Sequence, residues 1–225
     1  MSYDEHDAAY DEWMGNLYRE HREEAISEFT NERLQSYFLS YPLIAEPPMK
    51  ALVEAVKLKE AGFLSASFLF AQIATESGVK AVLLKPMVSG LVHDAPTATL
   101  VSDLALSHTG LDRFRNLLFQ TLHRIGGVDL STYQRPTGTR RLWDEITSLH
   151  SIRNAVVHRA EVPSLRDAET AIELAATVLK TIFPAVVKAV GLHLHEDVRI
   201  CNDSLCALEG KLSSELLERM RNGKR

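Results

Sequence analysis

Apolar residues recur at mostly helical spacing along most of the chain. In the first forty residues, large apolar side chains stand among charged residues at intervals typical of an amphipathic helix: Trp13, Leu17, Ile26, Phe29, Leu34 and Phe38. Pro47 and Pro48 cannot continue a helix, so we predict that this first helix ends before them. A second helix is predicted to begin near Met49.

A central helix is predicted for residues 63–85. The segment FLSASFLFAQIATESGVKAVLLK is apolar almost all round, which is typical of a helix surrounded by other helices. We expect Pro86 to end it and residues 89–100 to form a loop. A further amphipathic helix is predicted over residues 111–124, with Gly126 and Gly127 ending it.

Three more helices are predicted after a long polar loop over residues 126–139. Residues 140–160 and 163–190 both show helical periodicity. Ser164 is a natural N-cap with Asp167 three residues later, and Pro184 is expected to kink or divide the second of these helices. A last helix is predicted over residues 203–220. No alternating β pattern or hairpin signal competes, so the sequence predicts an all-α protein.

The charge of the chain is unevenly distributed. Its 225 residues, 45% of them apolar, suffice for one substantial domain with an appendage, and the net charge is -5. Residues 1–40 hold ten acidic residues against three arginines. We therefore interpret residues 1–46 as an acidic helical arm, 47–192 as a helical core and 193–225 as a C-terminal helical extension. The arm is expected to pack on the body or on a second subunit through four apolar residues: Trp13, Leu17, Phe29 and Phe38.

Composition also bears on location and cofactors. No stretch approaches the roughly 20 uninterrupted apolar residues of a membrane helix, and the acidic N-terminus lacks the pattern of a secretory signal, so we predict a cytoplasmic protein that does not contact a membrane. Cys201 and Cys206 do not form a disulfide framework. Together with His193 and His195 they offer one candidate metal site, but the spacings are not those of zinc fingers. We interpret this segment as a polar turn followed by a helix, and predict no metal or other cofactor.

The predicted helix over residues 140–160 carries polar groups on its apolar side. At about 100° per residue, Arg153 falls near the middle of the apolar stripe. A buried guanidinium needs a partner, and Glu76 stands in a similar position on the central helix, so we predict that Arg153 and Glu76 pair. Asn154 and His158 are four residues apart and share a face, and His150 extends that face by one turn.

These residue types suit metal-independent RNA cleavage. An arginine binds phosphate and stabilises charge on the phosphorane, and a histidine that titrates near neutrality moves protons while the 2'-hydroxyl attacks. His158 lies in the last helical turn, where the carbonyl groups favour protonated imidazole. Asn154 can orient either group.

The segment Arg153-Asn154-Ala155-Val156-Val157-His158 resembles the Arg-x4-6-His motif of the HEPN superfamily, which includes many metal-independent ribonucleases. The resemblance covers roughly residues 49–190. It implies a HEPN-like helical bundle in which Glu76, on an earlier apolar helix, faces the motif. It also implies a homodimer whose two motif helices form one cleft. The implied activity is an endoribonuclease of a prokaryotic defence or toxin-antitoxin system, leaving 2',3'-cyclic phosphate and 5'-hydroxyl ends, with an antitoxin or other regulatory protein as a further partner.

Arginines outnumber acidic residues between residues 108 and 141. We predict an RNA-binding surface formed by Arg135, Arg140, Arg141, Tyr133 and His150, through charge and base stacking. A solvated loop is the alternative for this segment. For the motif itself, the alternatives are a buried Arg153–Glu76 pair that fixes helix register, a histidine that caps a helix end, and a catalytically silent HEPN domain that serves as a protein-interaction or ligand-binding module.

Overall fold

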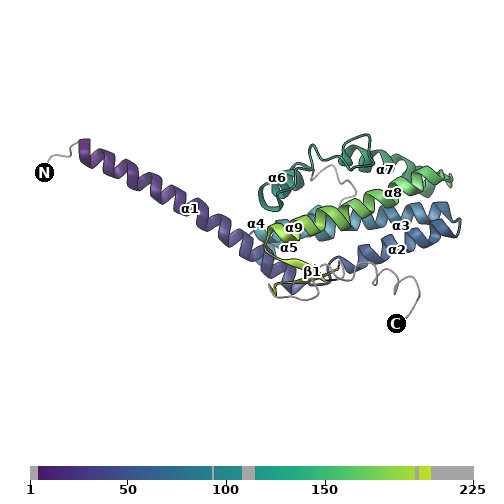
Figure 1. Cartoon of the computed structure of the whole chain (residues 1–225), viewed down its shortest axis with the longest axis horizontal. Helices are drawn as coiled ribbons and strands as arrows, with labels where there is room; N and C mark the ends of the chain where they lie inside the picture. Colours follow the sequence, from purple (N-terminus) through teal and green to yellow (C-terminus); the bar gives the residue numbers. More distant parts are fainter. Residues whose placement is uncertain (1–4, 93, 108–114, 196–197, 204–225) are drawn as a thin grey trace.

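The structure is a computed structural model that describes residues 5–92, 94–107, 115–195 and 198–203 (Figure 1). The helices in this part of the chain are α1 (Glu5–Ser40), α2 (Glu46–Glu60), α3 (Leu64–Ser77), α4 (Lys85–Leu91), α5 (Ala95–Ser107), α6 (Arg115–Gly126), α7 (Leu142–Arg159), α8 (Leu165–Thr177) and α9 (Phe183–Ala189). The prediction of an all-α bundle with an N-terminal helical arm is confirmed. The helix predicted over residues 203–220 lies outside the described residues, apart from Asp203.

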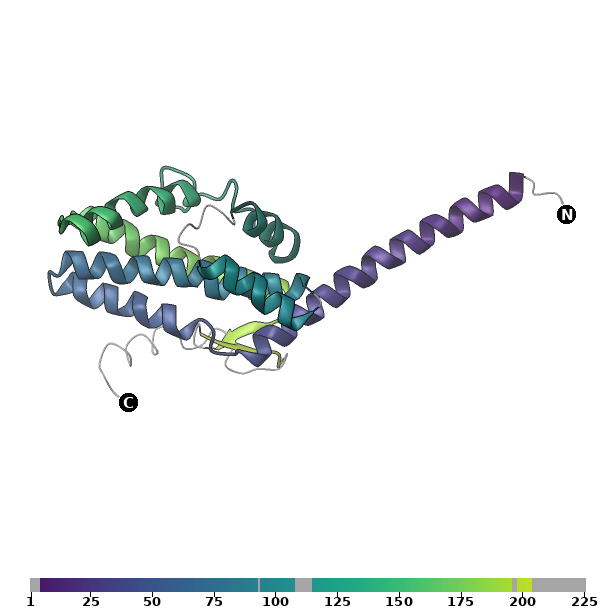
Figure 2. The same cartoon turned by 180° about the vertical axis from the view of Figure 1, so that it is seen from behind.

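The body is a bundle around α3. This helix packs between α2 and α8, and it also contacts α7 (Figures 1 and 2). A short turn joins α2 to α3, and Gly62 in that turn has a φ of 83°, a left-handed conformation that glycine adopts without steric strain. Helices α6 and α7 lie on the side of α8 and α9 away from α2. The most apolar helix of the sequence is therefore central, as its composition indicates.

Two long helices continue through the prolines that were expected to end or kink them. The π-helical turns η1 (Gly78–Leu84) and η3 (Val178–Ile182) join α3 to α4 and α8 to α9. Pro86 and Pro184 each follow two residues after such a turn. A proline in an α-helix clashes with the carbonyl four residues earlier, and in both cases that carbonyl belongs to the π turn. The wider turn accommodates the ring, so the predicted end of the helix at Pro86 and the predicted division at Pro184 are wrong.

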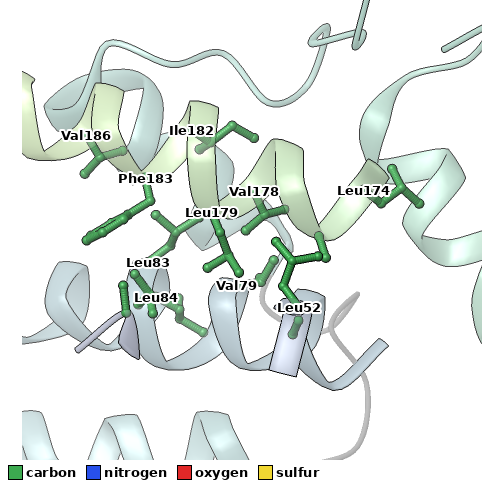
Figure 3. Packing of buried hydrophobic residues seen from close by; sticks show 14 of the residues in the cluster. Leu52, Val79, Leu83, Leu84, Leu174, Val178, Leu179, Ile182, Phe183 and Val186 are labelled. Carbon is green, nitrogen blue, oxygen red and sulfur yellow. The ribbon is translucent and has the colours of Figure 1, made fainter. Parts of the chain in front are cut away.

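The two π turns pack against each other in the core (Figure 3). Leu83, Leu179 and Phe183 are fully buried there. A Cβ added to Gly78 would lie 3.0 Å from Leu179 Cδ2 and 3.1 Å from Val178 Cγ1. The absence of a side chain at this position therefore lets the two long helices approach closely.

The same two helices carry the most apolar segments among the described residues. Leu64–Leu91 and Leu165–Ala189 are long and apolar enough to cross a membrane by length and composition. However, 61% and 50% of their most apolar windows are buried within the protein. Core helices of this kind meet the same criterion, so the two segments are weak evidence for membrane insertion.

Helix caps explain where α5 and α8 begin. The loop predicted for residues 89–100 is wrong at both ends, because α4 continues to Leu91 and α5 begins at Ala95. Asp94 Oδ2 accepts hydrogen bonds from the hydroxyl of Thr97 at 2.5 Å and from its amide at 2.9 Å, and these bonds lower the pKa of the Asp94 carboxyl. The capping box predicted for α8 is confirmed, with Ser164 and Asp167 each accepting a hydrogen bond from the backbone amide of the other.

The arm is helical as predicted, but most of it does not pack on the body. Figures 1 and 2 show α1 projecting well beyond the bundle. Leu34 and the predicted contact Phe38 are fully buried, whereas Trp13 is 57% exposed and Phe29 is 46% exposed. Leu17 is half-buried on the projecting part of the helix. The prediction that Trp13 contacts the body is therefore wrong for a single chain.

A short hairpin follows α9, where no strand was predicted. Strands β1 (His193–His195) and β2 (Arg199–Cys201) pair in antiparallel orientation. Ile200 is buried, and its amide donates a 2.8 Å hydrogen bond to the carbonyl of Pro42, just after α1. Strands of three residues are too short to give a recognisable alternating pattern, so the sequence analysis did not detect them.

We expect substitution of Gly90 by alanine to loosen α1 from the body. A Cβ at Gly90 would lie 2.6 Å from Leu34 Cγ, so the Leu34 side chain, or α1 with it, must shift. Overpacking of this kind should lower the free energy of unfolding by about 1–3 kcal/mol. Differential scanning calorimetry should then show a fall in Tm of about 2–4 °C per kcal/mol.

The matched control is Gly15→Ala, on the projecting part of α1, where an added Cβ meets no atom within 4 Å. This variant should keep or slightly raise the Tm, because alanine favours the helix by up to about 1 kcal/mol. An unchanged Tm in Gly90→Ala would contradict the close packing of α1 on α4.

Candidate functional site

The candidate site lies on the last turns of α7. Its first turns are part of the core, with Leu142, Ile146 and Leu149 buried. Beyond them the polar residues Arg153, Asn154 and His158 are all exposed, and His150 is half-buried one turn earlier. The helix ends at Ala160, which has a left-handed φ of 53° and donates its amide to the carbonyl of Ala155. Ala155 and Val156 in the same turns are buried, so α7 keeps a buried side along its length and exposes these polar residues on the other side.

The predicted ion pair between Arg153 and Glu76 is wrong in the single chain. Glu76 Oε1 instead lies 2.6 Å from Lys80 Nζ, one turn further along the same helical segment. A helical wheel gives the direction of a side chain but not which side of the helix its neighbours cover. Leu149 and Val156 are buried before and after Arg153, so the core continues along α7 on a neighbouring side and leaves Arg153 exposed.

The exposed polar groups remain available for a ligand. Arg153, Asn154 and His158 make no hydrogen bond or ion pair with any described residue. Together they present a planar cation that suits phosphate, an amide and a titratable imidazole on adjacent turns. We name Arg153, Asn154 and His158 the α7 triad. These residue types suit binding and proton transfer at a phosphodiester.

Apolar side chains are also exposed on α7 and on α3, which contact each other. Val157, within the same turns as the α7 triad, is 49% exposed, and Phe70 and Ile73 of α3 are exposed as well.

Arg135 does not belong to an RNA-binding surface. Its side chain is 6% exposed and contacts Glu145 through two hydrogen bonds, Nε to Oε2 at 2.6 Å and Nη2 to Oε1 at 3.3 Å. Its Nη1 also donates to Glu173 of α8. Burial alone would lower the pKa of the guanidinium, but the bonds to the two carboxylates outweigh it and raise that pKa. The prediction for Arg135 is wrong, because this residue ties the loop to α7 and α8.

The remaining residues of the predicted RNA-binding surface are divided between surface and core. Arg140 and Arg141 are exposed where α7 begins. Tyr133 is half-buried and packs against the core, and its carbonyl accepts a 2.9 Å hydrogen bond from the Leu142 amide. Arg141 and Arg153 are twelve residues apart, which corresponds to about 18 Å along a helix. Exposed arginines thus lie near both ends of α7.

Two missed ion pairs left different signals in the sequence. Lys80 follows Glu76 by four residues, the spacing at which oppositely charged side chains meet on a helix, so this pair could have been predicted. Glu145 falls among buried apolar residues on α7, where a carboxylate needs a cationic partner. That signal does not identify Arg135, which lies in a loop, as the partner.

No protein-family model matches this chain, and comparisons with curated proteins and with solved structures found no match. The resemblance of the α7 segment to the HEPN motif stays a prediction that rests on the motif residues and their helical setting.

We expect Arg135→Met to destabilise the protein strongly. The change leaves the Glu145 carboxylate buried without its cation, which should cost about 3–5 kcal/mol of unfolding free energy. Urea denaturation followed by circular dichroism measures this loss.

Arg140→Met is the matched control, because Arg140 is exposed in the same segment. Its unfolding free energy should stay within about 0.5 kcal/mol of the wild type. Equal stability of the two variants would contradict the structural role assigned to Arg135.

Proposed function

We propose that this protein is a metal-independent endoribonuclease that cleaves RNA at the α7 triad. The observation that carries the proposal is that Arg153, Asn154 and His158 are all exposed on adjacent turns and have no partner among the described residues. A buried arginine or histidine would need partners within the chain, whereas these three side chains are open to a ligand.

The exposure of Arg153 distinguishes the proposed function from a purely structural role of the motif. A buried Arg153–Glu76 pair would explain the arginine without any ligand. Arg153 is exposed, and Lys80 neutralises Glu76, so that explanation does not apply to a single chain. Glu76 is accordingly not required in the proposed reaction, and the α7 triad carries it.

The proposed reaction needs one proton removed and one proton supplied. The 2'-hydroxyl oxygen attacks the adjacent phosphorus and loses its proton to a neutral His158. The 5'-oxygen leaves with a proton from a protonated imidazole, which gives a 2',3'-cyclic phosphate and a 5'-hydroxyl. Arg153 stabilises the negative charge on the phosphorane, and Asn154 orients the phosphate or the imidazole.

A homodimer supplies the second imidazole. If the α7 helices of two chains meet across a two-fold axis, each His158 serves one proton transfer and both Arg153 side chains face one phosphate. The exposed apolar residues Val157, Phe70 and Ile73 support such contact, because burial against a second copy would remove them from water. RNA is then bound in a groove between two α7 helices, with Arg140 and Arg141 extending the basic surface.

The proposed biological setting is a prokaryotic defence or toxin-antitoxin system in the cytoplasm. A nuclease without a metal requirement is active whenever its cleft is assembled, so its restraint has to come from a partner. An antitoxin or other regulatory protein that covers the α7 triad would fill that role.

A catalytically silent interaction module is the second candidate. The observation in its favour is the projecting part of α1, where Tyr10, Trp13 and Tyr18 are each more than half exposed. Aromatic side chains in such a position suit a protein partner. RNA cleavage by the purified protein separates the two candidates.

We expect the purified protein to cleave RNA in the presence of EDTA and to leave 2',3'-cyclic phosphate ends. His158→Ala should reduce the cleavage rate by about 10²–10⁴-fold, the usual contribution of general acid–base catalysis. Gel assays measure the cleavage rates, and end-group analysis identifies the 2',3'-cyclic phosphate.

His123→Ala is the control, because His123 is an exposed histidine on α6. Its cleavage rate should equal that of the wild type. Equal rates for the His158→Ala variant and the wild type, or cleavage that EDTA abolishes, would refute the proposed mechanism.

We further expect Val157→Asp to dissociate the dimer and abolish cleavage. A carboxylate placed in an apolar two-fold contact would face its own copy across the interface, and the charges would repel. Analytical ultracentrifugation measures the mass, and cleavage is assayed at the same protein concentration. Leu100→Asp makes a similar change at an exposed position on α5 and should leave the mass and the rate unchanged. A Val157→Asp monomer that cleaves RNA at the full rate would exclude a composite cleft.

A further inference from the structure

The hairpin after α9 brings three metal-ligating side chains together. In its register His193 is paired with Cys201 and His195 with Arg199. Successive side chains of a strand alternate between faces, so His193 and His195 share a face, and Cys201 lies on that same face opposite His193. One ligand atom from each of His193, His195 and Cys201 lies within 4.8 Å of the other two. The sequence spacing of these residues, which is not that of a zinc finger, does not reveal this cluster, because it depends on the pairing of β1 with β2.

Two further observations distinguish this cluster from an ordinary polar hairpin. His193 Nε2 is buried and has no hydrogen-bond partner in the described part of the chain. A buried ring nitrogen without a partner is costly, and an unplaced ion is one of its recognised explanations. In addition, the amide of Asp203 donates to Cys201 Sγ at 3.3 Å, as expected around a thiolate that binds a metal.

We propose that His193, His195 and Cys201 bind a zinc ion. Imidazole nitrogen and thiolate sulfur are the ligands that zinc prefers, and tetrahedral zinc accepts three protein ligands with water at the fourth position. Bond lengths of about 2.0–2.3 Å place tetrahedral ligand atoms about 3.3–3.6 Å apart. The three ligand atoms already lie within 4.8 Å of one another, so small side-chain rotations bring them to the distances that zinc requires. His193 Nε2 is the assigned ligand atom of that residue. Cys206 lies outside the described residues and is not part of the proposed ligand set.

The proposed ion has a structural consequence. Two three-residue strands form a marginal hairpin by themselves, and a metal that links both strands stabilises their pairing. The hairpin contacts α9 through β1 and α1 through β2, and Ile200 is bonded to Pro42 just after α1. Zinc therefore stabilises the part of the fold that holds the base of the arm.

This inference is independent of the proposed nuclease. The hairpin lies toward the α1 end of the bundle, whereas α7 ends at the opposite end (Figures 1 and 2). Loss of zinc should thus affect stability, while cleavage at the α7 triad continues in EDTA below the Tm of the metal-free protein.

The experiment uses the full chain, stripped with EDTA and then titrated with Zn²⁺ or Co²⁺. We expect one zinc per chain after gel filtration, measured by elemental analysis, and a higher Tm with zinc, because an ion that binds the folded state stabilises it. Cobalt should give the near-ultraviolet absorption of a thiolate-to-cobalt bond. Zinc binding should weaken by at least about tenfold in each of three variants, His193→Ala, His195→Ala and Cys201→Ser. Cys201→Ser should also abolish the cobalt–thiolate absorption.

His123→Ala, at a histidine outside the hairpin, should bind zinc as the wild type does. The metal-free variants should match the metal-free wild type in circular dichroism and Tm, which separates loss of ligands from loss of fold. Zinc binding that survives Cys201→Ser, or a wild-type protein that retains no zinc and shows no thiolate absorption with cobalt, would overturn the proposal. If a ligand variant does not fold, the cobalt spectrum of the wild type still decides the question.

Discussion

The close packing of two long apolar helical segments, α3–η1–α4 and α8–η3–α9, determines how the rest of the chain is arranged. Their π turns meet where Gly78 approaches Val178 and Leu179, at a distance that leaves little room for a side chain. Each π turn also provides the wider backbone that lets the helix continue through a proline. Because both helices remain unbroken, each gives a long apolar surface on which other elements pack.

Helix α7 has a buried side that packs in the core and, in its last turns, the exposed residues of the α7 triad. Its buried first turns pack in the core, and the Arg135–Glu145–Glu173 ion pairs tie the preceding loop to α7 and α8. Buried ion pairs of this kind add specificity of position rather than much net stability. Such anchoring fixes the direction of the helix, so that the α7 triad is presented to solvent on a rigid element, as a binding or catalytic site requires.

The arm and the hairpin depend on each other at the opposite end of the bundle. Arg33 of α1 donates to the carbonyls of Ser89 and Val92, and Gln35 donates to the carbonyl of Val190, just before β1. These bonds hold only the last turns of α1, while its first turns expose aromatic residues. The proposed dimer and the proposed zinc ion concern different surfaces, and each would stabilise a part of the chain that has few contacts of its own.

The sequence by itself determined the helical class, the central position of the most apolar helix, the capping box of α8 and the residues of the α7 triad, because periodicity and capping are local properties. Only the tertiary structure decided that Arg153 is exposed and Arg135 is buried, since neighbouring elements determine which side of a helix or loop is covered. It also decided that Lys80 rather than Arg153 pairs with Glu76, and that most of α1 projects from the body. The same holds for His193 and Cys201, which are eight residues apart and meet only because two short strands pair.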